Sequence, residues 1–108
     1  MESKFEVIIF KTLRNKEPFN DLLNSLNRET RDRIFNRISR IKNGNFGDHK
    51  NLGSKIFELR FDFGSGYRIY FGIKDHKIII LLYGGNKKTQ NKDITKAKQY
   101  WEEYENQE

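Results

Sequence analysis

The chain has 108 residues and a formal net charge of +6, and its 14% aromatic content argues against intrinsic disorder. It has no Cys, which excludes a disulfide scaffold, a thiolate metal site and a Cys nucleophile. It also has no secretory signal pattern and no apolar run near the roughly 20 residues that span a bilayer, so we expect one cytoplasmic domain over residues 1–108 without membrane contact.

The first part of the chain predicts a strand and then two helices. β-Branched and aromatic residues in 5–10 indicate the strand. Apolar residues recur at helical spacing in 19–26, where Pro18 suits a first helical turn. They recur again in 34–41, with Asn27 as the candidate cap, so the two helices form a hairpin.

The second part predicts a loop, three strands and a closing helix. Residues 43–54 contain three Gly and little apolar content, so we expect a loop there. Strand-like runs follow at 55–61, 67–74 and 77–83, separated by turn-like residues. Apolar residues at helical spacing in 94–104 indicate the last helix.

The predicted fold class follows from this order, which is β-α-α-β-β-β-α. Strands and helices are segregated rather than alternating, which is typical of α+β proteins. We expect an antiparallel sheet with the helices packed on one face and the other face open.

The positive charge is concentrated in two blocks. Residues 28–42 carry six basic and two acidic side chains, and residues 50–92 carry nine basic and three acidic side chains. A basic surface attracts polyanions and is typical of nucleic-acid binders, although it can also be a solvated face that only aids solubility.

The alternation of the strands directs four polar side chains away from the helices. Glu58 and Arg60 then lie beside Arg68 and Tyr70, which would form a platform for phosphates and bases. The alternative is a cross-strand Glu–Arg pair on a wet face.

Lysines and histidines give two further hypotheses. Lys87 and Lys88 precede the last helix, where free N–H groups favour anions; the alternative is a polar loop with a capping Asn or Asp. The two histidines, His49 and His76, fit no metal-ligand spacing, so we expect neither a metal nor a cofactor.

Several motifs together resemble one protein family. They are GN-x-GD-x-K, ELR, GYRIYF and GG-x-KKTQ-x-x-DI, spread over residues 44–104. In this combination they are similar to the addiction-module killer proteins, which are HigB-type members of the RelE/ParE toxin superfamily.

The resemblance implies a toxin of a type II toxin–antitoxin pair. RelE-like relatives enter the ribosomal A site and cut mRNA without a metal, with the internal 2′-hydroxyl as nucleophile. The implied partners are mRNA, the ribosome and a helix-turn-helix antitoxin of the HigA type, through which alone operator DNA would be bound. The alternative is a ParE-type inhibitor that binds DNA gyrase.

The resemblance also implies roles for individual residues. Arg68 would bind the scissile phosphate, assisted by Arg60 and by Lys87, and Lys50 and Glu58 are competing candidates for the base. The remaining candidates for RNA contact are Lys88, Tyr70, Lys55 and Arg37.

Overall fold

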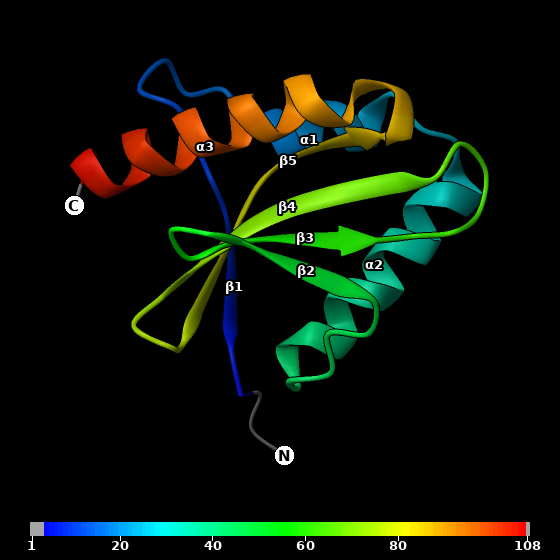
Figure 1. The fold of residues 1–108 in the computed structure, drawn as a ribbon, viewed down its shortest axis with the longest axis horizontal. Helices are drawn as coiled ribbons and strands as arrows, with labels where there is room; N and C mark the ends of the chain where they lie inside the picture. The colour runs from blue at the N-terminus through cyan, green and yellow to red at the C-terminus, as the bar shows by residue number, and fades with distance from the viewer. Residues whose placement is uncertain (1–3, 108) are drawn as a thin grey trace.

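The computed structural model describes residues 4–107, which form five strands and three α-helices (Figure 1). The elements are β1 (Glu6–Ile9), α1 (Pro18–Asn24), α2 (Arg28–Lys42), β2 (His49–Gly53), β3 (Ile56–Arg60), β4 (Tyr67–Lys74), β5 (Ile78–Asn86) and α3 (Gln90–Gln107). A single 3-10 turn (Lys87–Thr89) joins β5 to α3.

The strands form one sheet in the order β1-β5-β4-β3-β2. Neighbouring strands from β2 to β5 are antiparallel, whereas β1 runs parallel to β5, with Glu6 opposite Ile78 and Ile9 opposite Leu81. The α+β class is therefore confirmed, but the sheet is mixed rather than antiparallel.

The segment expected to be a loop contains an additional strand, β2. Its residues are mostly exposed and include no β-branched side chain, so the local sequence carries little strand signal. β2 forms because its backbone pairs with β3, with Lys50 opposite Glu58. The prediction of a loop over 43–54 was wrong for these five residues.

Helices α1 and α2 cover one face of the sheet. Their apolar stripes, which include Phe19, Leu23 and Ile34, pack against Ile69 and Phe71 from β4 in the larger core. Asn27 caps α2, as predicted, by accepting a hydrogen bond from the Thr30 N–H.

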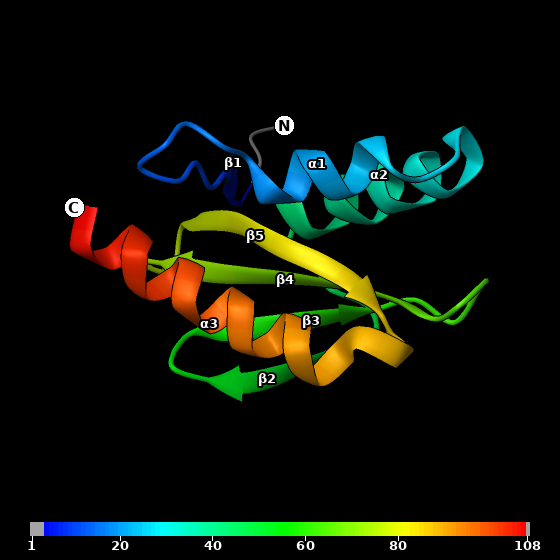
Figure 2. The ribbon, with the colours of Figure 1, turned by 90° about the horizontal axis from the view of Figure 1, so that it is seen from above.

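Helix α3 lies against the opposite face (Figure 2). Trp101 and Ala97 are buried there, and Trp101 packs with Ile80 and Leu82 in a second core. Gly72 permits this approach, because a side chain at that position would collide with the Trp101 ring. The expectation that all helices pack on one face was wrong.

The beginning of α3 fixes where a functional site can form. The helix starts one 3-10 turn after β5 and crosses the sheet over β5 and β4 (Figure 2). Its last turns cover apolar residues, while its first turn lies over the polar side chains of β3 and β4.

Candidate functional site

The polar residues picked out in the sequence meet at one end of the sheet. Arg60 at the end of β3 lies opposite Arg68 at the start of β4, and Arg68 lies opposite Gly85. Two residues further along each strand, Glu58 lies opposite Tyr70. Because opposed residues share a face, these four side chains lie on the side covered by α3.

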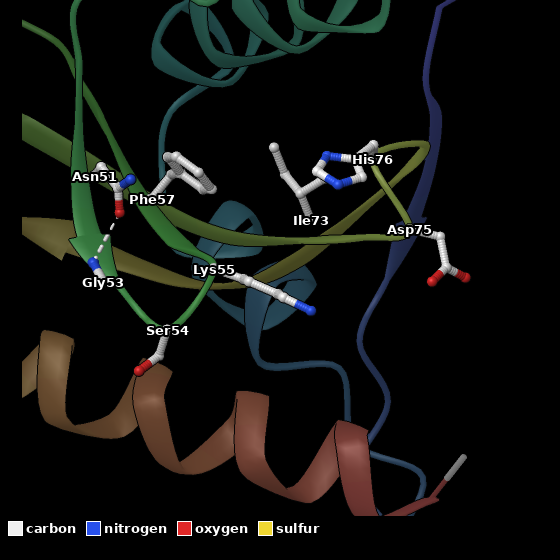
Figure 3. Close-up of a pocket in the computed structure, with 8 residues that line it drawn as sticks. All are labelled: Asn51, Gly53, Ser54, Lys55, Phe57, Ile73, Asp75 and His76. Carbon is white, nitrogen blue, oxygen red and sulfur yellow. Dashed lines mark hydrogen bonds between the residues drawn. The ribbon is translucent and has the colours of Figure 1, made fainter.

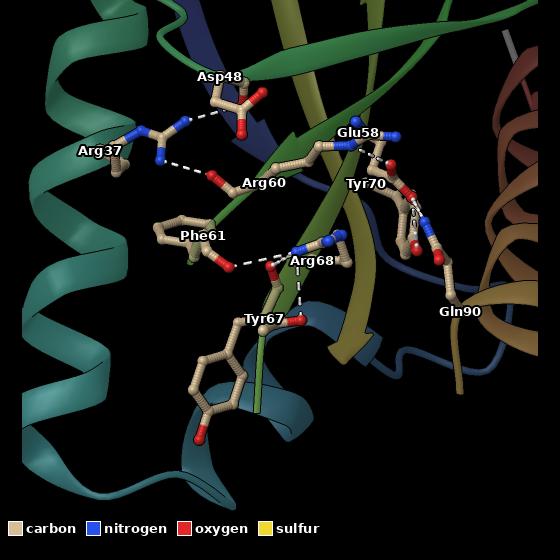
Figure 4. Close-up of polar contacts among 10 residues, drawn as sticks. Arg37, Asp48, Glu58, Arg60, Phe61, Tyr67, Arg68, Tyr70 and Gln90 are labelled. Atoms are coloured by element: carbon tan, nitrogen blue, oxygen red, sulfur yellow. Dashed lines mark hydrogen bonds and ion pairs between the residues drawn. The ribbon is translucent and has the colours of Figure 1, made fainter. Parts of the chain in front are cut away.

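Glu58 is the centre of a hydrogen-bonded network (Figure 4). Its Oε1 accepts a hydrogen bond from Arg60 Nε at 2.9 Å, which is also an ion pair. Its Oε2 accepts from Tyr70 Oη at 3.1 Å and from Gln90 Nε2 at 2.8 Å. The carboxylate thus ties three elements together, namely β3, β4 and α3.

These side chains do not form the open platform predicted from the strand alternation. Glu58 and Tyr70 are fully buried, Arg68 is 8% exposed, and only Arg60 reaches solvent substantially. The physical reason is that α3 covers this face and its Gln90 supplies a polar partner, so the polar residues are satisfied without water.

Burial and hydrogen bonding act in opposite directions on Glu58. Burial raises the pKa of Glu58, but the hydrogen bonds from Gln90, Arg60 and Tyr70 outweigh it and hold the pKa below its usual value. Burial, followed by the charge of Glu58, raises the pKa of Tyr70 well above its ordinary range. At neutral pH Glu58 is therefore a carboxylate and Tyr70 a neutral donor.

Arg68 turns back on the loop between β3 and β4. Its Nη1 donates to the carbonyl oxygens of Phe61, Gly66 and Tyr67 at 3.2, 3.3 and 3.0 Å. Its Nε is buried and has no hydrogen-bond partner among residues 4–107. Arg68 forms no ion pair with any residue of 4–107. The buried carboxylate of Asp93 is nevertheless near, because it lies against Gly85, the residue opposite Arg68.

Lys87 lies beside Arg68. A Cβ added at Gly66 would be 3.0 Å from Lys87 Cγ, so the lysine stem rests on the glycine whose carbonyl Arg68 contacts. Lys87 and Lys88 are exposed in the turn before α3, as predicted, and Asn86 caps that turn through the N–H groups of Lys88 and Thr89.

The other candidate residues lie at different distances from this cluster. Lys50 on β2 is exposed and lies directly opposite Glu58 on the same face. Lys55 belongs to the turn at the far end of β3, beside a hollow of 370 Å³ lined also by Phe57, Ile73 and His76 (Figure 3). The structure therefore brings Lys50 to the site but not Lys55.

Arg37 has a structural environment that the sequence did not reveal. Its guanidinium donates to the backbone carbonyls of Arg60, Phe46 and Asp48 at 2.8, 3.1 and 3.1 Å. It also lies over the Phe61 ring at 4.6 Å. Arg37 thus holds the loop after α2 against the end of β3.

Two residues of the site were not predicted from the sequence. Gln90 completes the Glu58 network, and Asp93 is a buried carboxylate that accepts a hydrogen bond from Thr89. A signal existed for Asp93: it shares a helical stripe, at spacings of four, with Ala97 and Trp101, which are both buried. A polar residue on a buried stripe must find a partner.

The charges at this end of the sheet leave an excess of positive charge. The acids are Glu58, which pairs with Arg60, and Asp93, which lies against Gly85 opposite Arg68. Arg68, Lys87 and Lys88 form no ion pair among residues 4–107, so the basic side chains outnumber the two acids. The exposed ammonium group of Lys87 can bind an anion such as a phosphate diester, and the positive charge of Arg68 nearby favours such binding. Within residues 4–107, no group of three His, Asp or Glu side chains is arranged to hold a metal ion, and no helix is long and apolar enough to cross a membrane.

The site and the mixed sheet define a small basic α+β protein with basic side chains gathered at one end of its sheet. Residues 21–102 match the family described as phage derived protein Gp49-like (DUF891), and the chain belongs to this family. The family is linked to the toxins of toxin–antitoxin systems. An uncharacterised protein of Haemophilus influenzae is 49% identical over 72 residues, which cover 67% of this chain and 73% of that protein.

Proposed function

We propose that the protein is a HigB-type toxin that cuts mRNA on the ribosome in the cytoplasm and is neutralised by a helix-turn-helix antitoxin. The observation that supports the proposal is the proximity of two basic side chains, Arg68 and Lys87, neither of which forms an ion pair among residues 4–107. This is the arrangement that a scissile phosphate requires, because negative charge builds up on it during cleavage.

Roles for the neighbouring residues follow from their environments. Arg68 and Lys87 bind the scissile phosphate, and Arg60, held by Glu58, faces the same end of the sheet. Glu58 is buried, accepts three hydrogen bonds and has a lowered pKa, which makes it a poor base and a good positioning residue. Lys50, exposed opposite Glu58, is then the candidate base for the 2′-hydroxyl.

The experiment is to induce the protein in bacteria and to map new 5′ ends of transcripts. We expect codon-phased cuts in translated messages together with growth arrest. Intact transcripts accompanied by an SOS response would contradict a nuclease and support a gyrase inhibitor instead.

Matched variants connect this activity to the site. Lys87→Ala removes one of the two phosphate ligands, and we expect it to reduce cleavage about 10²–10³-fold, as is typical for one positioned charge. Lys98→Ala, which removes an exposed lysine from the α3 surface, is the control and should cut like the parent protein. Equal cleavage by both variants would remove Lys87 from the site.

A further inference from the structure

A second basic hollow lies between α2 and the loop that follows β3. It has a volume of 230 Å³, and we call it the α2 pocket. It is lined by Arg33, Asn36, Arg37, Arg40, Phe61, Asp62 and Phe63. Three of the seven residues are arginines and two are phenylalanines, which is a combination suited to an anionic and partly aromatic ligand.

Two of the arginines are stacked on aromatic rings. The guanidinium carbon of Arg33 lies 4.5 Å from the centroid of the Phe63 ring, and that of Arg37 lies 4.6 Å from the Phe61 ring. The two rings meet edge to face at 5.8 Å. Stacking fixes the plane of a guanidinium while its edge can still donate to a phosphate, and unpaired RNA bases also stack on such planes.

Arg33 and Arg40 are the arginines that are available to a ligand. The donors of Arg37 are engaged by three backbone carbonyls. Arg33 is 51% exposed and its neighbour Glu29, at 3.5 Å, forms an exposed ion pair of the kind that contributes little. Arg40 is exposed and forms no ion pair among residues 4–107. Among the residues that line the pocket, Asp62 is the one carboxylate.

The α2 pocket, on the α2 side of the sheet, is linked to Arg68, on the α3 side, through two consecutive peptide groups at the end of β3. Arg37 donates to the carbonyl of Arg60, and Arg68 donates to the carbonyl of the next residue, Phe61 (Figure 4). The end of β3 thus lies between the two basic regions and holds them in fixed positions. A single polyanionic strand could pass from one to the other.

We propose that the α2 pocket binds the backbone of a single-stranded RNA whose neighbouring nucleotides occupy the Arg68 and Lys87 site. The inference rests on the proposed function for the identity of the ligand as RNA. Guanidinium planes, on which unpaired bases stack, and the neighbouring Arg68 and Lys87 favour RNA over an acidic peptide, which would use the charges but not the planes.

The test measures binding rather than cleavage. The ligand is a 12-nucleotide single-stranded RNA with 2′-O-methyl groups, which cannot supply the attacking hydroxyl. We expect Arg33→Gln combined with Arg40→Gln to weaken binding by at least about tenfold. Because each phosphate contact on a single strand contributes about 0.7 to the slope of log K against log salt, the slope should fall by about 1.4.

The control removes the same charge from the same helix. Arg28 and Lys42 are exposed on the flank of α2 that faces away from the pocket, so Arg28→Gln combined with Lys42→Gln should change affinity by less than about threefold. Arg37 is left unchanged in both variants because it holds the loop. Circular dichroism checks that both variants are folded.

Three results would overturn the inference. They are equal losses in the two double variants, no loss in either, or a Kd for a poly-glutamate peptide that depends on Arg33 and Arg40 while the RNA is not bound. Because the modified RNA is not a substrate, this result does not depend on cleavage. Intact transcripts in cells would contradict the nuclease but leave the binding measurement valid.

Discussion

The two faces of β4 are both covered by helices, yet they enclose opposite kinds of interior. Towards α1 and α2 the strand presents Ile69, Phe71 and Ile73, which join a continuous apolar core. Towards α3 it presents Tyr70, which is fully buried, and Arg68, which is 8% exposed, and both are held by hydrogen bonds. The comparison shows that burial on this sheet follows from helix coverage and not from apolar composition.

The α3 face is itself divided. The later part of α3, where Trp101 packs over Gly72, is buried on apolar side chains. Its first turn instead contributes Gln90 to the Glu58 network. The apolar part anchors the helix, and the polar part positions charges. If this division is correct, substitutions in the two parts should have different signatures.

The largest effect is expected from the apolar part. Trp101→Ala removes the side chain that seals the second core, and substitutions of this kind cost about 3–5 kcal/mol. Urea unfolding followed by circular dichroism would measure the loss. A change below 1 kcal/mol would mean that α3 is not anchored by Trp101.

A smaller but specific effect is expected from the polar part. Glu58→Gln keeps the volume but removes the charge that pairs with Arg60, and it mismatches at least one of three donors. The cost at pH 7 should be about 1–3 kcal/mol. Tyr70→Phe is the companion variant, which removes one donor and leaves the carboxylate with two. A Glu58→Gln protein as stable as the parent would show that the Glu58 network does not contribute to the free energy of unfolding.

Lowering the pH should affect the stability contributions of the polar and apolar parts of the α3 face differently. The pKa of Glu58 is lower in the folded protein than in the unfolded chain, so its contribution is present above the unfolded pKa and is lost as the pH falls through the folded pKa. We expect the stability difference between the parent and Glu58→Gln to shrink below about pH 4, whereas the effect of Trp101→Ala should not depend on pH. Unfolding curves from pH 2.5 to pH 7 would test this, and a constant difference for Glu58→Gln would contradict it.

The smallest effect on stability is expected outside both interiors. Lys87 and Lys88 are exposed in the turn before α3, so replacing both with Ala should change the free energy of unfolding by no more than about 0.5 kcal/mol. Cleavage should nevertheless be lost. Retention of full cleavage in a translation extract would show that this turn is not part of the anion site.

Much of the fold could be predicted from the periodicity of the chain. The strand at 67–74 matches β4 at both ends, and the cap at Asn27 was identified correctly. β2 could not be found in this way, because its residues have no preference for strands and take their conformation from β3. The parallel pairing of β1 was also invisible, since it joins segments at distant positions in the sequence.

The sequence correctly predicted that Glu58, Arg60, Arg68 and Tyr70 share one face of the sheet, but their environment was misjudged. Alternating polar residues in β3 and β4 indicate a solvent-exposed face, and this inference fails when the polar groups satisfy one another. Here the face is covered by α3, and Gln90 from that helix donates a hydrogen bond to Glu58, which helps to satisfy the buried carboxylate. The catalytic roles of Arg68, Lys87 and Lys50 stay predictions until they are measured.

The parallel pairing of β1 with β5 has a consequence for the order of folding. The hairpins β2–β3, β3–β4 and β4–β5 can close locally, but β1 can join only after the chain has passed through β5. Closing so long a loop is entropically costly and is typical of late steps. Synthesis adds about 5–20 residues per second, and the edge of β5 stays unpaired until β1 has formed its hydrogen bonds with it. We therefore expect the amide hydrogens of β1 to gain protection last in refolding, after those of β4.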